Sequence, residues 1–146
     1  MNAKHSRSNS LIFLLERTLR QCRKALQDEL RAAGSGLSVD QWLLLQQVAV
    51  KTQHQHELAA MTAKDPASVT RMLNLLAKKK LITRSTDKND KRSILVTATT
   101  AGKKVVSQCE IAVERFRKTA GKGLTQEELN LQKTVLDKLF ENCEGK

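Results

Sequence analysis

The sequence predicts a mainly α-helical fold that carries one small β-hairpin. Long segments near both ends of the chain repeat apolar residues at spacings of three and four, the pattern of a helix with one buried face. Residues 81–98 instead place β-branched segments on either side of a polar turn. A chain of 146 residues suffices for one hydrophobic core and is short for two, so we expect a single domain over residues 1–146.

The first predicted helix begins near Leu11 and ends near the glycines at 34 and 36. Ser38, followed three residues later by Gln41, forms a capping box that begins a second helix, which runs to about Lys51. The apolar stripe of the first helix consists of Leu11, Leu15, Leu19, Cys22, Leu26 and Leu30.

A polar lead and a short third helix with Leu58, Ala59 and Met61 come next. Asp65 and the only proline, Pro66, are the N-cap and first position of a fourth helix, which separates into two faces. The face predicted to be core holds Val69, Met72, Leu73 and Leu76, and the polar face, which has no acidic residue, holds Ser68, Arg71, Asn74 and Lys78.

The β-hairpin is predicted from "LITRS" and "SILVTA", which flank the charged tip "TDKNDKR". A long helix then begins at Thr99 or Thr100, and a second capping box, Thr125 with Glu128, begins the last helix. The apolar stripes of these two helices are Val105, Val106, Cys109, Ala112, Val113 and Phe116, and then Leu129, Leu136, Leu139 and Phe140.

The net charge of +11 is concentrated in one part of the chain. Residues 64–104 contain 11 lysines and arginines against 3 acidic residues, a net charge of +8. Such a local excess is typical of a protein that binds a polyanion, although a solvated basic surface is the alternative. A membrane-surface helix is disfavoured, because aromatic residues make up only 3% of the chain.

The composition also indicates the compartment. No apolar run approaches the roughly 20 residues of a membrane span, and the apolar patch near the N-terminus, broken at Glu16, is too short for a signal peptide. Cys22, Cys109 and Cys143 are far apart and odd in number, which favours a reducing compartment over a disulfide framework. We therefore expect a cytoplasmic protein with no membrane partner.

The order short helix, turn, two-faced helix and hairpin predicts a winged helix-turn-helix over about residues 37–98. The fourth helix would be the recognition helix, which enters the major groove of DNA. There Arg71 can donate two hydrogen bonds to guanine, Asn74 can pair with adenine, and Ser68 and Thr70 can reach phosphates or bases, with Lys78 on the same face. An ordinary solvated helix face is the alternative.

Three segments, "LSVDQWLLLQQV", "ELAAMTAKDPASVTRMLNLLAKKKLITRSTDKNDKRSILVTATTAG" and "GLTQEEL", resemble the MarR family of transcriptional regulators over about residues 37–140. The most specific feature is the wing pattern of Asp90, one residue, and Arg92. The resemblance implies a homodimer, joined through about residues 9–34 and 99–143, that binds double-stranded DNA at a pseudo-palindromic operator. It also implies a repressor that a small aromatic or amphipathic effector releases.

The resemblance assigns roles in the wing as well. Arg92 is expected to enter the minor groove, whose narrow, negative channel favours a cation. Asp90 is expected to hold the wing's shape by pairing with Arg92 or with backbone amides, and a solvated hairpin tip is the alternative. Lys88, Lys91 and Arg84 are expected to contact phosphates.

Two positions depart from the family pattern. Lys80 stands where relatives carry a left-handed glycine after the recognition helix, so either the chain accepts a cost of about 1 kcal/mol or the helix exits differently. Ala98 replaces a leucine before the next helix, which thins the packing under the hairpin.

Other candidate sites carry weaker signals. A solvated loop is favoured over a metal site at His54, His56 and Glu57. Cys22, on the apolar stripe of the first helix, is expected to be a buried packing residue rather than a thiol sensor, and Cys143 to be exposed.

For an effector, Phe13, Arg17 and Trp42 are candidates by position alone, and we favour a surface arginine and a core tryptophan.

No catalytic triad, glycine-rich phosphate loop or pair of acids in a cleft-forming stretch is evident, so we expect neither an enzyme nor a cofactor. Two alternatives to an effector-controlled DNA regulator stay open. One is a winged-helix module that binds protein, and the other is a regulator that senses thiol oxidation through Cys22. RNA binding is disfavoured by the scarcity of stacking aromatics.

Overall fold

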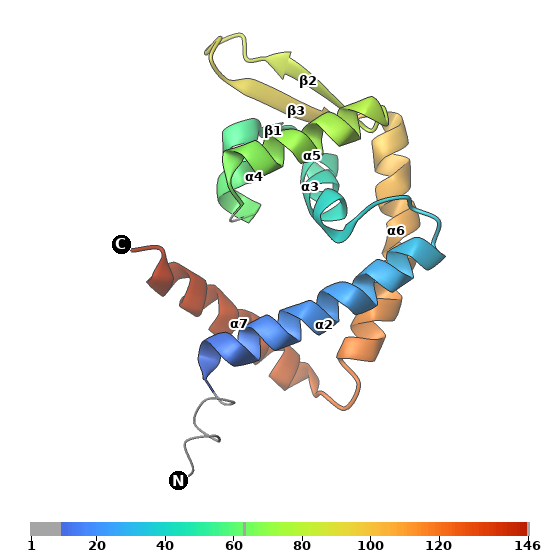
Figure 1. Ribbon diagram of the computed structural model, residues 1–146, viewed down its shortest axis with the longest axis vertical. Coiled ribbons are helices and arrows are strands. Elements are labelled where there is room, and N and C mark those ends of the chain that lie inside the picture. Colours follow the sequence, from blue (N-terminus) through green and yellow to red (C-terminus); the bar gives the residue numbers. More distant parts are fainter. Residues whose placement is uncertain (1–9, 63, 146) are drawn as a thin grey trace.

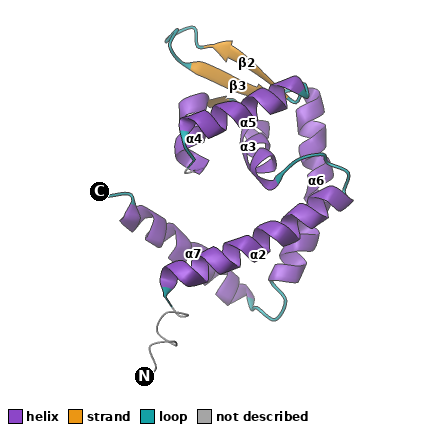
Figure 2. Cartoon of the chain, in the orientation of Figure 1, coloured by secondary structure: helices purple, strands orange, loops and turns teal. Residues whose placement is uncertain are grey.

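The computed structural model describes residues 10–62 and 64–145 (Figures 1 and 2). Residue 9, where the predicted N-terminal dimerisation segment begins, and both ends of the predicted 1–146 domain lie outside these ranges. The helices are α2 (Leu11–Ala32), α3 (Val39–Val50), α4 (Gln55–Thr62), α5 (Pro66–Lys78), α6 (Thr100–Ala120) and α7 (Gln126–Cys143), and the strands are β1 (Gln53–His54), β2 (Ile82–Thr86) and β3 (Ile94–Ala98).

The predicted helices and the caps that begin them are confirmed. The Ser38 hydroxyl accepts a hydrogen bond from the Gln41 backbone N–H, and the Gln41 side chain accepts one from the Ser38 N–H, both at 3.1 Å. Thr125 and Glu128 form the same reciprocal pair at the start of α7. Because these bonds join residues three apart, they depend on the local sequence alone.

The predicted two-stranded hairpin is part of a three-stranded antiparallel sheet in the order β1-β3-β2. The hairpin register pairs Ile82 with Ala98 and Thr86 with Ile94. The β1 strand was not predicted: within the predicted polar lead before α4, Gln53 and His54 pair with Val96 and Leu95 of β3. Two residues are too few to show the alternation of polar and apolar side chains that marks a strand in the sequence. This strand forms only because the fold places β3 beside it.

The core lies where α3, α5 and the sheet meet the C-terminal half of α2 and the part of α6 between Gly102 and Val113. Its fully buried large side chains include leucines from α2, α3, α4 and α5, and Cys109 from α6. Gly102 permits the closest approach, because a Cβ there would overlap the Leu81 carbonyl oxygen. The α6 helix can therefore pack directly against the segment that leaves α5.

The remaining helices form a second region. In Figure 1 the winged lobe occupies the upper half, α2 and α7 the lower half, and α6 runs between them. No side chain of α7 is buried. The described part of the chain therefore leaves a large apolar surface exposed on α2, α6 and α7, comprising Leu11, Ile12, Phe13, Leu15, Leu19, Ile111, Leu129, Leu131, Val135, Leu136 and Phe140.

Among the described residues, no helix combines the length and apolar character that crossing a membrane requires.

Candidate nucleic-acid interface

The α5 helix is anchored at its N-terminus by Asp65. The Asp65 carboxylate accepts hydrogen bonds from the Ser68 hydroxyl at 2.6 Å and from the Ser68 backbone N–H at 2.9 Å. These two bonds lower the pKa of Asp65, because they favour its charged form. Pro66 at the first helical position completes the predicted start of the helix.

The two faces of α5 lie as predicted. Val69, Leu73 and Leu76 are buried and Met72 is half-buried against the same core. On the opposite face, Arg71, Asn74 and Lys78 are exposed. The helix can therefore present its polar side chains to a partner without losing its packing.

The two predicted hydroxyl contacts are less free than the sequence suggests. Ser68 donates its only hydroxyl proton to Asp65. Thr70 donates its proton to the Pro66 carbonyl oxygen at 2.9 Å and accepts from the Gln55 side chain of α4 at 3.1 Å. In this arrangement both hydroxyls can accept a hydrogen bond but neither can donate one, and a phosphate needs a donor.

The end of α5 keeps the left-handed exit without a glycine. Lys80 has φ 61°, and its N–H donates to the Ala77 carbonyl oxygen at 2.9 Å. The Leu81 N–H donates to the Leu76 carbonyl oxygen at 3.0 Å, which closes the wider ring of a Schellman-type end. Of the two predicted outcomes, the chain therefore retains the conformation and its strain.

The wing tip is the turn between β2 and β3, and Asp90 organises it. The Asp90 Oδ1 atom accepts from the Arg92 backbone N–H at 3.1 Å and contacts the Arg92 Nε atom at 3.5 Å. The Asp90 carbonyl oxygen accepts from the Ser93 N–H at 2.9 Å. Asp90 thus contacts Arg92 at its backbone N–H and its Nε atom, while the Arg92 side chain as a whole is 94% exposed.

The predicted solvated loop around His54 is wrong. His54 lies on β1, and its Nδ1 atom is 2.9 Å from the Ser93 hydroxyl while its Nε2 atom is 3.8 Å from the Asp87 carboxylate. Asp87 and Ser93 are the two ends of the turn between β2 and β3, so His54 attaches this turn to β1. No cluster of three potential metal ligands occurs within residues 10–62 and 64–145.

Arg84 and Asn74, predicted to contact DNA separately, contact each other. The Arg84 Nη1 atom of β2 donates to the Asn74 Oδ1 atom of α5 at 2.6 Å. No local pattern in the sequence signals this pair, because it depends on the packing of β2 against α5.

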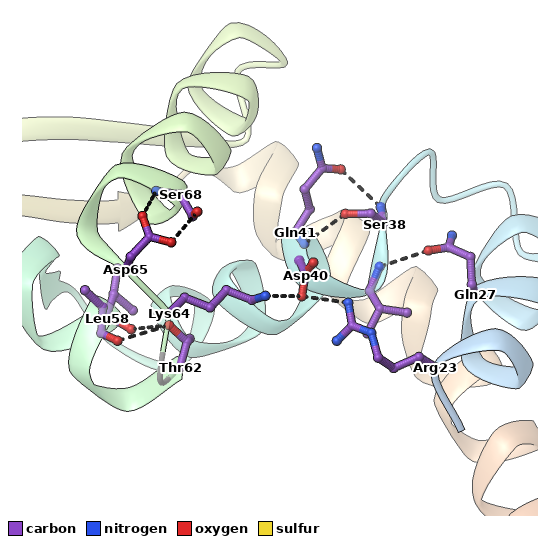
Figure 3. A network of polar contacts seen from close by, with 12 residues as sticks. Arg23, Gln27, Ser38, Asp40, Gln41, Leu58, Thr62, Lys64, Asp65 and Ser68 are labelled. Carbon is purple, nitrogen blue, oxygen red and sulfur yellow. Dashed lines mark hydrogen bonds and ion pairs between the residues drawn. The ribbon is translucent and has the colours of Figure 1, made fainter. Parts of the chain in front are cut away.

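A polar joint links α2 to the start of α3 and to the segment before α5 (Figure 3). The Asp40 Oδ1 atom lies 2.8 Å from Arg23 Nη2 and 3.2 Å from Lys64 Nζ, as ion pairs rather than well-aligned hydrogen bonds. Burial alone would raise the pKa of Asp40, but the Arg23 and Lys64 contacts outweigh burial and lower it. The Gln27 side chain reinforces the joint by accepting from the Val39 N–H at 3.0 Å.

The three effector candidates do not come together. Phe13 and Arg17 line one open surface hollow on α2, with the Arg17 guanidinium 5.6 Å from the centre of the Phe13 ring. Trp42 is half-buried on α3 and packs against the core, as the favoured alternative expected. Cys22 lines the same hollow and is half-buried, so it is less enclosed than predicted.

Cys109 is buried, and burial raises the pKa of its thiol, which disfavours the reactive thiolate form. Cys143 is exposed, as expected.

Six exposed cations of the winged lobe lie on α5, on β2 and at the wing tip: Arg71, Lys78, Arg84, Lys88, Lys91 and Arg92. Since an α-helix fits the major groove and a hairpin can reach the neighbouring minor groove, this surface has the form of a DNA-binding site.

Comparison with known proteins finds similarity to one family of regulators. A model of the MarR family matches residues 35–93. A cysteine-to-serine mutant of MarR from E. coli, crystallised with operator DNA, is 26% identical, with a TM-score of 0.77 over 86% of this chain and 90% of that chain.

Two further structures are similar over most of their length. BpsR from Bordetella bronchiseptica, described by the regulation of its DNA binding by 6-hydroxynicotinic acid, is 25% identical, with a TM-score of 0.82 over 90% of this chain and 94% of that chain. A probable transcriptional regulator from Pseudomonas aeruginosa is also 25% identical, with a TM-score of 0.80 over 90% of this chain and 98% of that chain.

Proposed function

We propose that this chain, which a MarR-family model matches over residues 35–93, is a transcriptional regulator of that family that binds double-stranded DNA as a homodimer. The observation that carries the proposal is the exposed polar face of α5 beside a wing that ends in Arg92, within a segment of net charge +8. Residues 37–98 would bind DNA, and residues 9–34 and 99–143 would form the dimer.

The proposed mode of control is repression at a pseudo-palindromic operator. Two recognition helices related by a twofold axis would read half-sites about one helical turn apart. We place the protein in the cytoplasm, where DNA lies in the bacteria from which the similar structures come. Family members are transcription regulators rather than enzymes, and nothing in the proposed mechanism needs a cofactor.

The proposed effector is a small aromatic or amphipathic molecule. The support comes from the relative whose DNA binding is regulated by 6-hydroxynicotinic acid, an aromatic acid. On this chain, Arg17 beside Phe13 could hold a carboxylate against an aromatic face, whereas Trp42 lies elsewhere.

Arg71→Ala tests the DNA-binding proposal. If Arg71 contacts base edges, the variant should bind a selected operator about 5- to 150-fold more weakly, which corresponds to roughly 1–3 kcal/mol, and should lose base preference at one position per half-site. Lys24→Ala is the matched control, since it removes an exposed positive charge from α2. Titration against operator and random duplexes gives both quantities.

The same titration separates the alternatives. A protein-binding module should show little salt-dependent affinity for any duplex and should tolerate the loss of Arg71 and Arg92. An equal loss on operator and random DNA would mean that Arg71 contacts only the backbone. A thiol-sensing regulator should lose DNA binding on mild oxidation, and Cys22→Ser should abolish that loss.

A further inference from the structure

The contact between Arg84 and Asn74 bears on which base the protein selects. Arg84 lies in the middle of β2, and Asn74 lies on the exposed face of α5. The two side chains meet through one short hydrogen bond of 2.6 Å from Arg84 Nη1 to Asn74 Oδ1. Both residues are exposed, so the pair lies on the surface that the proposed function turns toward DNA.

The chemistry of arginine determines which way the Asn74 amide faces. A guanidinium group has five N–H donors and no acceptor. Only the amide oxygen of Asn74 can therefore face Arg84, and the amide nitrogen must lie on the other side. Among the described residues, no hydrogen bond occupies the Asn74 Nδ2 atom.

This arrangement conflicts with the expected pairing of Asn74 with adenine. A bidentate contact to adenine needs the amide oxygen to accept from N6 while the amide nitrogen donates to N7. Here one lone pair of the oxygen already accepts a charge-assisted hydrogen bond from Arg84, which fixes the amide so that adenine N6 could use only the other lone pair. What Asn74 presents outward is therefore a pair of donors, the two N–H groups of its amide nitrogen.

In the major groove, guanine is the base that offers two acceptors, O6 and N7, and no donor on that edge. We propose that Arg84 is a specificity-determining residue that holds Asn74 as a donor, so that this position of each half-site selects guanine instead of adenine. The proposal rests on the proposed function and assigns Arg84 a role beyond the phosphate contact expected from the sequence.

Selection of binding sites from random duplex DNA tests the proposal, with the parent protein, Arg84→Ala and Asn74→Ala compared. The parent should enrich guanine at one position per half-site. Arg84→Ala frees the amide oxygen, so the preference at that position should shift to adenine, by roughly tenfold in relative affinity. Asn74→Ala should lose the preference there, and the double variant should match Asn74→Ala.

Lys88→Ala is the matched control, because it removes one exposed wing cation that the structure does not place on Asn74. It should weaken binding to all duplexes without changing base preference. Thermal unfolding of each variant establishes that it folds.

The outcomes separate two failures. If the parent selects an operator but prefers adenine at this position, or if Arg84→Ala weakens binding with unchanged base preference, Arg84 does not set specificity. If the parent selects no sequence at all, the proposed function itself fails.

Discussion

At the scale of single residues, the wing depends on one carboxylate. Asp90 accepts from the Arg92 backbone N–H and contacts the Arg92 Nε atom, which orients a side chain that is otherwise 94% exposed. An acidic residue is electrostatically unfavourable on a loop that is proposed to face DNA. Its presence is explained if the shape of the turn matters more than the charge.

We therefore expect Asp90→Ala to bind operator DNA more weakly than the parent, although it removes a negative charge. Asp90→Asn is the control, because it keeps an acceptor oxygen for the Arg92 N–H while removing the charge, and it should bind at least as well as the parent. Titration of both variants at several salt concentrations is the measurement. Tighter binding by Asp90→Ala would mean that Asp90 does not stabilise the shape of the turn.

In the same titrations, Arg92→Ala should lower the affinity directly. It should also reduce the slope of log affinity against log salt by about one unit per lost contact, or about two per dimer. An unchanged slope would contradict placement of Arg92 against the DNA.

Lys80 provides a second test at this scale. Its φ of 61° is unfavourable for a residue with a Cβ. Lys80→Gly should raise the free energy of unfolding by roughly 0.5–1 kcal/mol, after the greater freedom of glycine in the unfolded chain is subtracted. Lys80→Ala is the control, since it removes the same charge and keeps the Cβ. Urea denaturation measures both, and equal values for the two variants would exclude backbone strain as the cause.

At the scale of elements, the Asp40 joint holds α2, α3 and the start of α5 in register. One carboxylate oxygen contacts Arg23 from α2 and Lys64 from the segment before α5. The joint therefore connects the helical region to the segment that leads into α5. Because the Asp40 side chain is 26% exposed, these ion pairs are screened less than pairs on the open surface.

Asp40→Asn should lower the free energy of unfolding by about 1–2 kcal/mol at neutral pH. Since the pKa of Asp40 is lowered on folding, its contribution is present above the unfolded-state pKa of about 3.8 and is lost as the pH falls through the folded-state value. The difference between parent and variant should thus be constant from pH 7 to about pH 5 and shrink below about pH 4.

Asp28→Asn is the control for this joint, because Asp28 pairs with Arg31 on the exposed surface of α2 at 3.4 Å. It should change stability much less at every pH. Equal effects of the two substitutions in urea titrations would mean that the joint is only another surface ion pair.

At the scale of the whole molecule, the apolar surface of α2, α6 and α7 requires a partner. An 18-residue helix with no buried side chain and several exposed leucines gains little from folding onto its own chain. A second copy can cover this surface, and the twofold axis would also place two recognition helices on one face.

Light scattering should give about twice the chain mass of 16.3 kDa at micromolar concentration. Leu136→Asp, in the exposed apolar stripe of α7, should shift the mass toward the monomer, whereas Lys51→Asp at the exposed end of α3 should not. A monomeric parent would remove both the dimer and the palindromic operator.

The sequence by itself determined the helices and the hairpin. The caps at Ser38, Asp65 and Thr125 bond to residues three positions ahead, and the apolar stripes repeat at helical spacing, so both signals are complete within one segment. The two faces of α5 follow from the same periodicity. The division of polar from core side chains was therefore predictable from this segment alone.

Only the tertiary structure decided which polar groups meet. The β1 strand, the His54 contacts with the wing, the Asp40 joint and the Arg84–Asn74 pair all join residues at least 10 positions apart and on different elements. Their partners depend on how helices and strands pack, and a hydrogen bond forms only where packing brings donor and acceptor within about 3 Å. Local patterns therefore identified the candidate DNA-facing residues, and packing decided which of their donors and acceptors remain free.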